Sequence, residues 1–212
     1  WAYLVYYIGF YFIKSFDYDA HMFILKNKYF FIIESIKDID LSNIKITSKF
    51  ILIYRNKNNT EDFNKILRFR KLCKSKKIQF YVSNNLRLAS LLKADGIYIS
   101  AHNRNLRVAQ LKYFNYKIIG SAHNVREINI KLLQGCSTIV FSRLFKTAYE
   151  YKKGFLGVTK FNLFKISRKE NLVPLGGIKL SNLNKVNMIN CNSIALSSEI
   201  KKKPAKIISR LF

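Results

Sequence analysis

Short apolar runs recur along the chain from residue 28 onward, and longer stretches with helical spacing of apolar and polar positions separate most of them. Eight of these runs have the length of a strand, and most lack the polar alternation of a half-exposed strand. Continuous apolar strands are typical of parallel sheets in which both faces are covered. The predicted strands are Tyr29–Ile33, Phe50–Tyr54, Ile78–Val82, Gly96–Ile99, Lys117–Gly120, Thr138–Phe141, Leu172–Leu175 and Ser193–Leu196.

Amphipathic stretches between these strands predict helices. Thr60 and Asn124 are the expected N-caps of two of them, each with an acidic residue in the following turn. Eight strands with seven crossovers predict an α/β fold of the (β/α)8 TIM-barrel type in a single domain. An open doubly wound sheet is the alternative, but no G-x-G-x-x-G follows the first strand. The predicted helices are Thr60–Arg70, Asn85–Leu92, Leu106–Phe114, Val125–Leu133 and Asn182–Ile189.

The 212 residues suit one barrel domain, which we expect to span residues 28–212. Residues 1–27 form an N-terminal extension. The chain starts with Trp1, and Met22 is a candidate for the start of the natural protein. Residues 1–13 are strongly apolar but shorter than the roughly 20 residues of a membrane helix, and they lack the features of a signal peptide. We therefore predict no membrane partner.

The net charge of +26 would ordinarily indicate a nucleic-acid ligand. The lysines are scattered, however, and Lys, Asn, Ile, Phe and Tyr are abundant together, as in proteins from AT-rich genomes. No recognised nucleic-acid module accompanies them, so we predict no nucleic-acid partner and a positive field that attracts anionic substrates. Cys73, Cys136 and Cys191 have no metal-ligand spacing and are expected to be buried free thiols in a cytoplasmic protein.

Chemistry in a (β/α)8 barrel lies at the carboxyl ends of the strands. Arg55 and Lys57 follow the second predicted strand at alternating positions, so they lie on the same side of an extended chain and could bind a diphosphate. Polar residues, including Asn84 and Asn103, follow the third and fourth strands, and Ser121 and His123 follow the fifth. Scattered surface charge and an ordinary structural histidine are the competing interpretations.

Residues with little or no side chain follow the last two strands: Gly176 and Gly177, then Ser197 and Ser198. Glycine lets the backbone approach an anion closely, and free N–H groups at the start of a helix attract it. In (β/α)8 barrels a phosphate site commonly lies after strands seven and eight. The two turns are therefore predicted to form one phosphate site, although a glycine pair is also a common feature of tight turns.

An ordered set of motifs between about residues 28 and 200 resembles the thiamine phosphate synthase family, which includes thiazole tautomerase-like members. Ile53–Lys57 is similar to the family's Gln-Leu-Arg-Glu-Lys, and Ala94–Ile99 to its Ala-Asp-Gly-Val-His-Leu. The remaining matches, to its Gly-Val-Ser-x-His, Gly-x-Gly-Pro-x-x-Pro-Thr, Gly-Gly-Ile and Ser-Ala-Ile segments, are Ile118–Asn124, Phe141–Thr147, Val173–Ile178 and Ala195–Ile200.

The resemblance implies an enzyme of thiamine biosynthesis that joins hydroxymethylpyrimidine diphosphate to thiazole phosphate and releases diphosphate with Mg²⁺. The implied partners are these small phosphorylated pyrimidine and thiazole substrates, and a homo-oligomer is compatible with it. Carried over by position, the roles divide into three groups. Arg55 and Lys57 hold diphosphate with Ser121 beside the pyrimidine, Asn84 and Asn103 occupy the metal positions, and the thiazole phosphate is held by Thr147, Lys152, Gly176, Gly177, Ser197 and Ser198.

Several positions depart from the family pattern. The metal-binding aspartates of the family are Asn84 and Asn103 here, and its glutamine on the second strand is Ile53. Its loop lysine falls at Glu150, where Lys152 or Lys153 could substitute. Three functions stay open: a divergent synthase, which we favour, a metal-independent thiazole-phosphate tautomerase with His123 as acid and base, and a catalytically decayed binder of a phosphorylated ligand.

Overall fold

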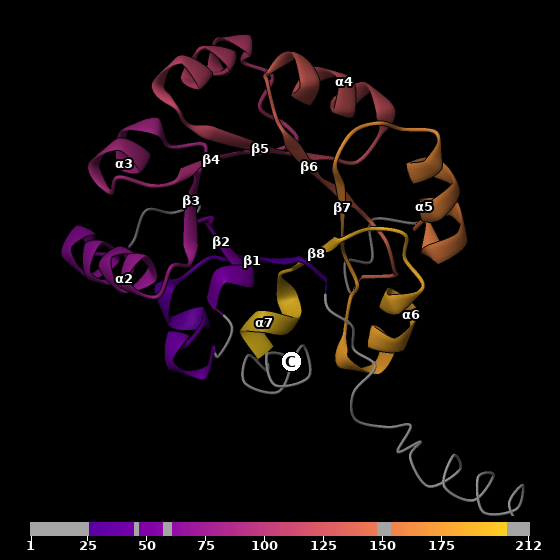
Figure 1. Cartoon of the computed structure of the whole chain (residues 1–212), viewed down its shortest axis with the longest axis horizontal. Helices are drawn as coiled ribbons and strands as arrows, with labels where there is room; N and C mark the ends of the chain where they lie inside the picture. Colours follow the sequence, from indigo (N-terminus) through magenta and orange to yellow (C-terminus); the bar gives the residue numbers. More distant parts are fainter. Residues whose placement is uncertain (1–25, 45–46, 57–60, 148–153, 203–212) are drawn as a thin grey trace, which may run out of the picture.

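Eight parallel strands form a nearly closed barrel with helices around it (Figure 1). The computed structural model describes residues 26–44, 47–56, 61–147 and 154–202. The fold confirms the predicted (β/α)8 class, and all eight predicted strands are present with ends that shift by no more than two residues. They are β1 (Lys28–Ile33), β2 (Phe50–Tyr54), β3 (Gln79–Ser83), β4 (Gly96–Ile99), β5 (Lys117–Ala122), β6 (Thr138–Ser142), β7 (Leu172–Leu175) and β8 (Ser193–Leu196).

Side chains on the two faces of each strand enter different layers, because successive residues of a strand point to opposite sides. In β2, Ile51 and Ile53 belong to an inner cluster, whereas Phe50, Leu52 and Tyr54 pack outward beneath the helices. All five residues are buried, which explains why the sequence of this strand shows no polar alternation. The inner cluster consists of Phe30, Ile32, Ile51, Ile53, Tyr81, Tyr98, Ile119, Val140, Val173 and Ala195.

The crossovers are less regular than the strands. Between β1 and β2 the described residues form only short 3-10 turns, and the crossover from β4 to β5 is a 3-10 helix rather than the predicted α-helix. The α-helices are α2 (Phe63–Ser75), α3 (Leu86–Leu91), α4 (Val125–Leu133), α5 (Gly157–Ile166), α6 (Leu183–Asn187) and α7 (Ser198–Lys202); the 3-10 turns are η1 (Ile36–Asp38), η2 (Leu41–Asn43), η3 (Thr47–Lys49), η4 (Leu106–Phe114) and η5 (Leu180–Asn182).

Of the two predicted helix N-caps, the structure confirms one and corrects the other. Asn124 caps α4 as expected, because its side chain accepts a hydrogen bond from the Glu127 N–H. The predicted cap of α2 was wrong: Asp62 caps this helix through the Asn64 and Lys65 N–H groups, and Thr60 lies outside the described residues. A carboxylate satisfies the free N–H groups of a first turn at least as well as a hydroxyl does.

The three thiols are free, as predicted. Cys73 and Cys136 are buried, and burial raises the pKa of each to about 12. Cys191 is only partly buried, which corrects the expectation for that residue.

The barrel has one seam without a hydrogen-bonded ladder. Strand order runs from β7 through β6, β5, β4, β3, β2 and β1 to β8, so β7 and β8 are the edges of the ladder. These two strands lie side by side, but no parallel register joins them in the described structure. The two turns predicted to bind phosphate follow β7 and β8, and they therefore flank this seam.

Candidate active site

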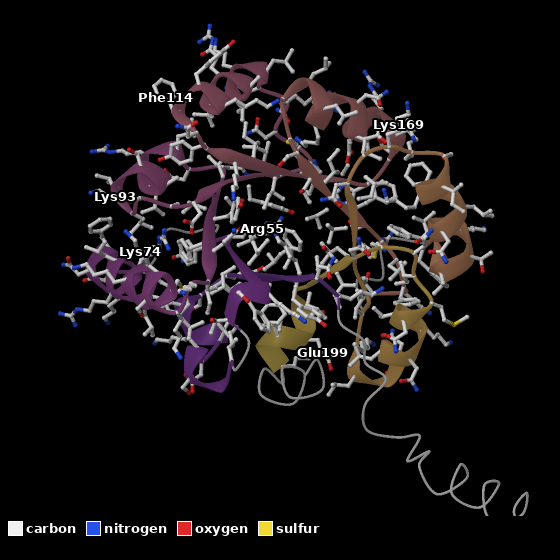
Figure 2. All side chains as sticks on the ribbon, in the orientation of Figure 1. Arg55, Lys74, Lys93, Phe114, Lys169 and Glu199 are labelled. Carbon is white, nitrogen blue, oxygen red and sulfur yellow. The ribbon has the colours of Figure 1, made fainter. Side chains whose placement is uncertain are left out.

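The carboxyl ends of the eight strands lie on one side of the barrel, which we call the mouth. Ser121 is the penultimate residue of β5, and the other predicted site residues that the structure describes follow one of these strand ends. Arg55 follows β2, and Figure 2 shows it near the centre of the ring of strands. Lys74, Lys93 and Lys169, in contrast, lie at separate places toward the outer edge of the molecule.

Ser121 contacts the hydroxyl of Tyr98, an inward-facing residue of β4, and the charge of Arg55 acts on the same group. Burial raises the pKa of Tyr98, and a hydrogen bond with the Ser121 side chain and the positive charge of Arg55 oppose this effect. The Arg55 backbone N–H donates to the Ile33 carbonyl at 2.8 Å, which fixes the point where the chain leaves β2. Two residues predicted from separate strands therefore both act on the same inward-facing tyrosine.

The two predicted metal positions, Asn84 and Asn103, are brought together. The Asn103 Nδ2 donates to the Asn84 Oδ1 at 3.3 Å, and the Asn84 Nδ2 donates to the Ser100 Oγ at 2.9 Å. Asn84 adopts a left-handed backbone conformation with φ of 54°, which asparagine tolerates better than most residues. The structure thus places the residues side by side, as a shared site requires.

Their chemistry does not suit a resident magnesium ion. Mg²⁺ needs oxygen ligands in octahedral geometry and is usually bound through carboxylates. Here the Asn84 Oδ1 already accepts from the Ser100 N–H at 3.1 Å, and the Asn103 Oδ1 accepts from the Asn105 N–H at 3.0 Å. Within the residues that the structure describes, no cluster of three or more His, Cys, Asp or Glu side chains could hold a metal ion. This donor set does not fit the ion.

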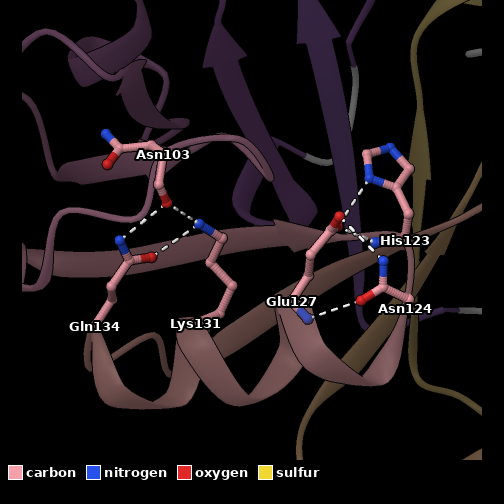
Figure 3. Close-up of polar contacts among 6 residues, drawn as sticks. All are labelled: Asn103, His123, Asn124, Glu127, Lys131 and Gln134. Atoms are coloured by element: carbon pink, nitrogen blue, oxygen red, sulfur yellow. Dashed lines mark hydrogen bonds and ion pairs between the residues drawn. The ribbon is translucent and has the colours of Figure 1, made fainter.

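His123 is held by Glu127, one turn into α4 (Figure 3). The Glu127 Oε2 accepts from the His123 backbone N–H at 2.7 Å and lies 3.0 Å from the His123 Nδ1. Burial alone would raise the pKa of Glu127, but the hydrogen bonds from His123 and Asn124 outweigh it and the net pKa is lowered. A carboxylate at Nδ1 favours the tautomer that leaves Nε2 as an acceptor. The exposed imidazole can therefore take up a proton at Nε2.

The glycine turn after β7 packs against the loop that follows β6. Gly176 and Gly177 have φ values of +101° and +68°, a region that only glycine enters readily. The Gly176 carbonyl accepts from the Phe145 N–H at 2.9 Å. A Cβ atom on Gly177 would lie 2.5 Å from the Lys146 carbonyl oxygen, so both the conformation and the close approach require glycine here.

Arg143 is a site candidate that the sequence reasoning missed. It directly follows β6, its Cγ would lie 3.2 Å from a Cβ on Gly176, and its Nη1 donates to the Thr147 Oγ1 at 3.5 Å. The stem of Arg143 thus lies against Gly176, and its guanidinium contacts Thr147, another predicted phosphate ligand. The available signal was an arginine two residues after the predicted strand Thr138–Phe141, which is the same kind of signal that singled out Arg55.

The remaining predicted ligands divide between described and undescribed residues. Ser197 and Ser198 follow β8 as expected, and Ser198 is the first residue of the five-residue helix α7. Lys57 and Lys152 lie outside the described residues. Lys131 and Gln134 of α4 also escaped prediction: both are fully buried, and both donate to the carbonyl of Asn103.

A nearly closed parallel barrel with polar residues at the carboxyl ends of its strands defines the (β/α)8 class of proteins. Within that class, a family model described as thiamine monophosphate synthase matches residues 41–200, and the chain belongs to this family. A thiamine-phosphate synthase of Pelagibacter ubique is 27% identical over 181 residues, which cover 81% of this chain and 87% of that protein. One from Prochlorococcus marinus strain AS9601 is 29% identical over 175 residues, covering 80% of this chain.

The match to the Prochlorococcus protein covers 48% of its length, so the chain spans about half of that relative. Among solved structures, a thiamine phosphate pyrophosphorylase from Pyrococcus furiosus superposes with a TM-score of 0.65 over 88% of this chain and 98% of that one, at 18% identity. At that identity the likeness supports the fold alone. In the described part of the chain, no helix is both long and apolar enough to cross a membrane.

Proposed function

We propose that this protein is a divergent thiamine phosphate synthase. In the proposed reaction the thiazole nitrogen of thiazole phosphate attacks the methylene carbon of hydroxymethylpyrimidine diphosphate. A carbon–nitrogen bond forms, the carbon–oxygen bond to diphosphate breaks, and the electron pair leaves with the diphosphate. The proposal is supported chiefly by the place of Arg55 after β2 near the centre of the ring of strands, together with the glycine and serine turns that follow β7 and β8 beside the seam, in a chain of this family.

Arg55 neutralises the charge that develops on the departing diphosphate, and the sequence places Lys57 two residues further on. Ser121 orients the pyrimidine from the side of the Tyr98 hydroxyl. Because the amides of Asn84 and Asn103 do not fit a resident magnesium ion, no step is assigned to a bound metal. The fixed cations of the chain stabilise the leaving group instead.

The phosphate of the thiazole is held at the other part of the mouth. The backbone around Gly176 and Gly177 and the turn at Ser197 and Ser198 supply donors, and Thr147 supplies a hydroxyl. Arg143 adds a charged, planar donor group, which suits a phosphate monoester. Holding both substrates in one mouth converts a bimolecular encounter into a reaction between positioned groups. We further propose a barrel domain over residues 28–212, a cytoplasmic location and no nucleic-acid ligand.

The test is to incubate the protein with both substrates, with and without Mg²⁺, and to measure thiamine phosphate and released diphosphate. We expect equal amounts of the two products. Arg55→Met should lower kcat on the order of 10²-fold, the effect of removing a group that stabilises developing charge. Arg68→Met, on the exposed side of α2, is the matched control and should leave the rate unchanged. An absence of thiamine phosphate under all conditions refutes the synthase.

A second candidate function is tautomerisation of a thiazole phosphate, and the contact between His123 and Glu127 favours it. A histidine whose Nδ1 faces a carboxylate is suited to carry a proton at Nε2 between two positions of a substrate. If the His123→Ala variant catalyses tautomerisation at the wild-type rate, His123 is not the acid and base and this second function is ruled out. Calorimetric binding of thiazole phosphate without either turnover would identify a decayed relative that retains only the phosphate site.

A further inference from the structure

Helix α4 buries a lysine that the proposed reaction does not use. The Lys131 side chain is fully buried, and the ion pairs found in the described part of the chain do not include it. Burial lowers the pKa of Lys131, because removing an ammonium group from water disfavours its charged form. An apolar side chain would fill the same space without this cost. The contacts of Lys131 indicate why a lysine is present.

The ammonium group is directed at the backbone of the loop after β4 (Figure 3). Its Nζ donates to the Asn103 carbonyl at 2.6 Å and to the Gln134 Oε1 at 2.8 Å. Gln134, also fully buried, donates through Nε2 to the Asn103 and Asn105 carbonyls, each at 3.0 Å. Two buried side chains of one helix end thus satisfy two carbonyls of the loop.

β5 provides the space for this arrangement. The Lys131 stem runs past Gly120, where a Cβ atom would lie 2.9 Å from both its Cγ and its Cδ. The Cys136 Sγ would lie 2.8 Å from the same Cβ. Glycine at position 120 is therefore what allows the lysine to pass between the sheet and its helix and to reach the carboxyl end of β4.

The loop held in this way carries residues of the mouth. The loop runs from Ser100 to Asn105. Its Asn103 side chain contacts Asn84, which follows the neighbouring strand β3. Its His102 ring lies 6.2 Å from the His123 ring, measured between centroids. One turn earlier on the same helix, Glu127 holds His123 itself. A single face of α4 therefore fixes the loops after both β4 and β5.

We infer that Lys131 and Gln134 are positioning residues that hold the loop carrying His102 and Asn103 in place to receive the pyrimidine diphosphate. This assignment to a substrate rests on the proposed function, whereas the hold on the loop does not. Neither residue touches the substrate; each acts through the carbonyls of Asn103 and Asn105. A misplacement of about 1 Å in such a loop is enough to reduce turnover strongly.

The test is Lys131→Met, which keeps the length and apolar volume of the stem and removes the donors. Amide hydrogen exchange reports on the loop directly, because the Asn103 N–H donates to the Ser100 carbonyl and the Asn105 N–H to the Asn103 side chain. We expect these two amides to exchange at least about tenfold faster, with the strands unaffected. Gly120→Ala displaces the same stem and should also speed exchange at these two amides. Lys65→Met, at an exposed position of α2, is the control and should leave their exchange unchanged.

In coupling assays Lys131→Met should raise KM for the pyrimidine diphosphate on the order of tenfold and leave KM for thiazole phosphate unchanged. Unchanged exchange at Asn103 and Asn105, or faster exchange spread evenly through the barrel, overturns the inference, since a merely structural lysine gives one of these results. If the wild-type protein makes no thiamine phosphate, the proposed function fails while the exchange experiment still decides the role of Lys131.

Discussion

Gly177→Ala and Gly157→Ala form a matched pair that isolates the close packing beneath the predicted phosphate site. The two glycines have nearly the same positive φ, +68° and +70°. A Cβ on Gly157 meets nothing within 4 Å among the described residues, whereas one on Gly177 lies 2.5 Å from the Lys146 carbonyl oxygen and 2.6 Å from that of Phe145. Both substitutions therefore place a Cβ atom on a residue with positive φ, but only Gly177→Ala also brings that atom into contact with neighbouring backbone atoms.

The magnitudes follow from these contacts. A left-handed conformation costs a residue with a Cβ about 1–2 kcal/mol, and we expect this loss of unfolding free energy in both variants. At Gly177 the obstructing atoms are backbone, so the loop after β6 must move, and overpacking adds roughly 1–3 kcal/mol. For a chain of this size, the additional loss lowers Tm by roughly 2–12 °C relative to Gly157→Ala.

Urea unfolding followed by circular dichroism measures the two free energies, and calorimetry with thiazole phosphate measures the site. We expect Gly177→Ala to be less stable than Gly157→Ala and to bind the ligand more weakly, because Phe145 and Lys146 move away from the turn. Gly157→Ala should bind like the wild type. Equal stability of the two variants would show that the loop after β6 yields freely, and the reasoning from close approach would be refuted.

Three further predictions concern the polar groups of the mouth. The lowered pKa of Glu127 stabilises the fold above about pH 4.5, and this contribution is lost as pH falls through the lowered value. Glu127→Gln should therefore be about 1 kcal/mol less stable than wild type at pH 7 and equal to it near pH 2 in urea titrations; a gap independent of pH contradicts this. Arg143→Met should raise KM for thiazole phosphate roughly 10- to 100-fold, with KM for the pyrimidine diphosphate unchanged in steady-state assays. A rise in both constants would point to general disruption. Joint Asn84→Asp and Asn103→Asp substitution should create saturable Mg²⁺ binding in calorimetry that the wild type lacks, and equal heats from both proteins argue against the reading of this pair.

The strands were predictable because both of their faces are apolar. In β2 the run Phe50–Tyr54 buries every side chain, so its bounds are visible in the sequence. The crossovers were harder to predict. Leu106–Phe114 has a sequence compatible with a helix but forms a 3-10 helix, and its last residue precedes Asn115 in a left-handed conformation. Tertiary packing determines the pitch of such a short segment, and local sequence carries little of that information.

Residues of the mouth could be predicted where they come directly after a strand. Arg55, Asn84 and His123 could be placed by counting strand ends, because parallel strands end at the same edge. Lys131 and Gln134 could not, since they lie on a helix and act on backbone carbonyls that carry no sequence signal. Arg143 was passed over because its significance depends on its approach to Gly176, a contact between loops after different strands.

The seam between β7 and β8 gives a ligand a mechanical role in the barrel. Seven of the eight strand junctions are joined by backbone ladders, and in the part of the chain that the structure describes this one is not. An anion that accepts hydrogen bonds from the turns after β7 and β8 would tie the two edge strands together. Binding of the phosphate and association of the two edge strands would then be thermodynamically linked. The bound phosphate would oppose separation of β7 from β8, and separation of these strands would weaken phosphate binding by the same free energy.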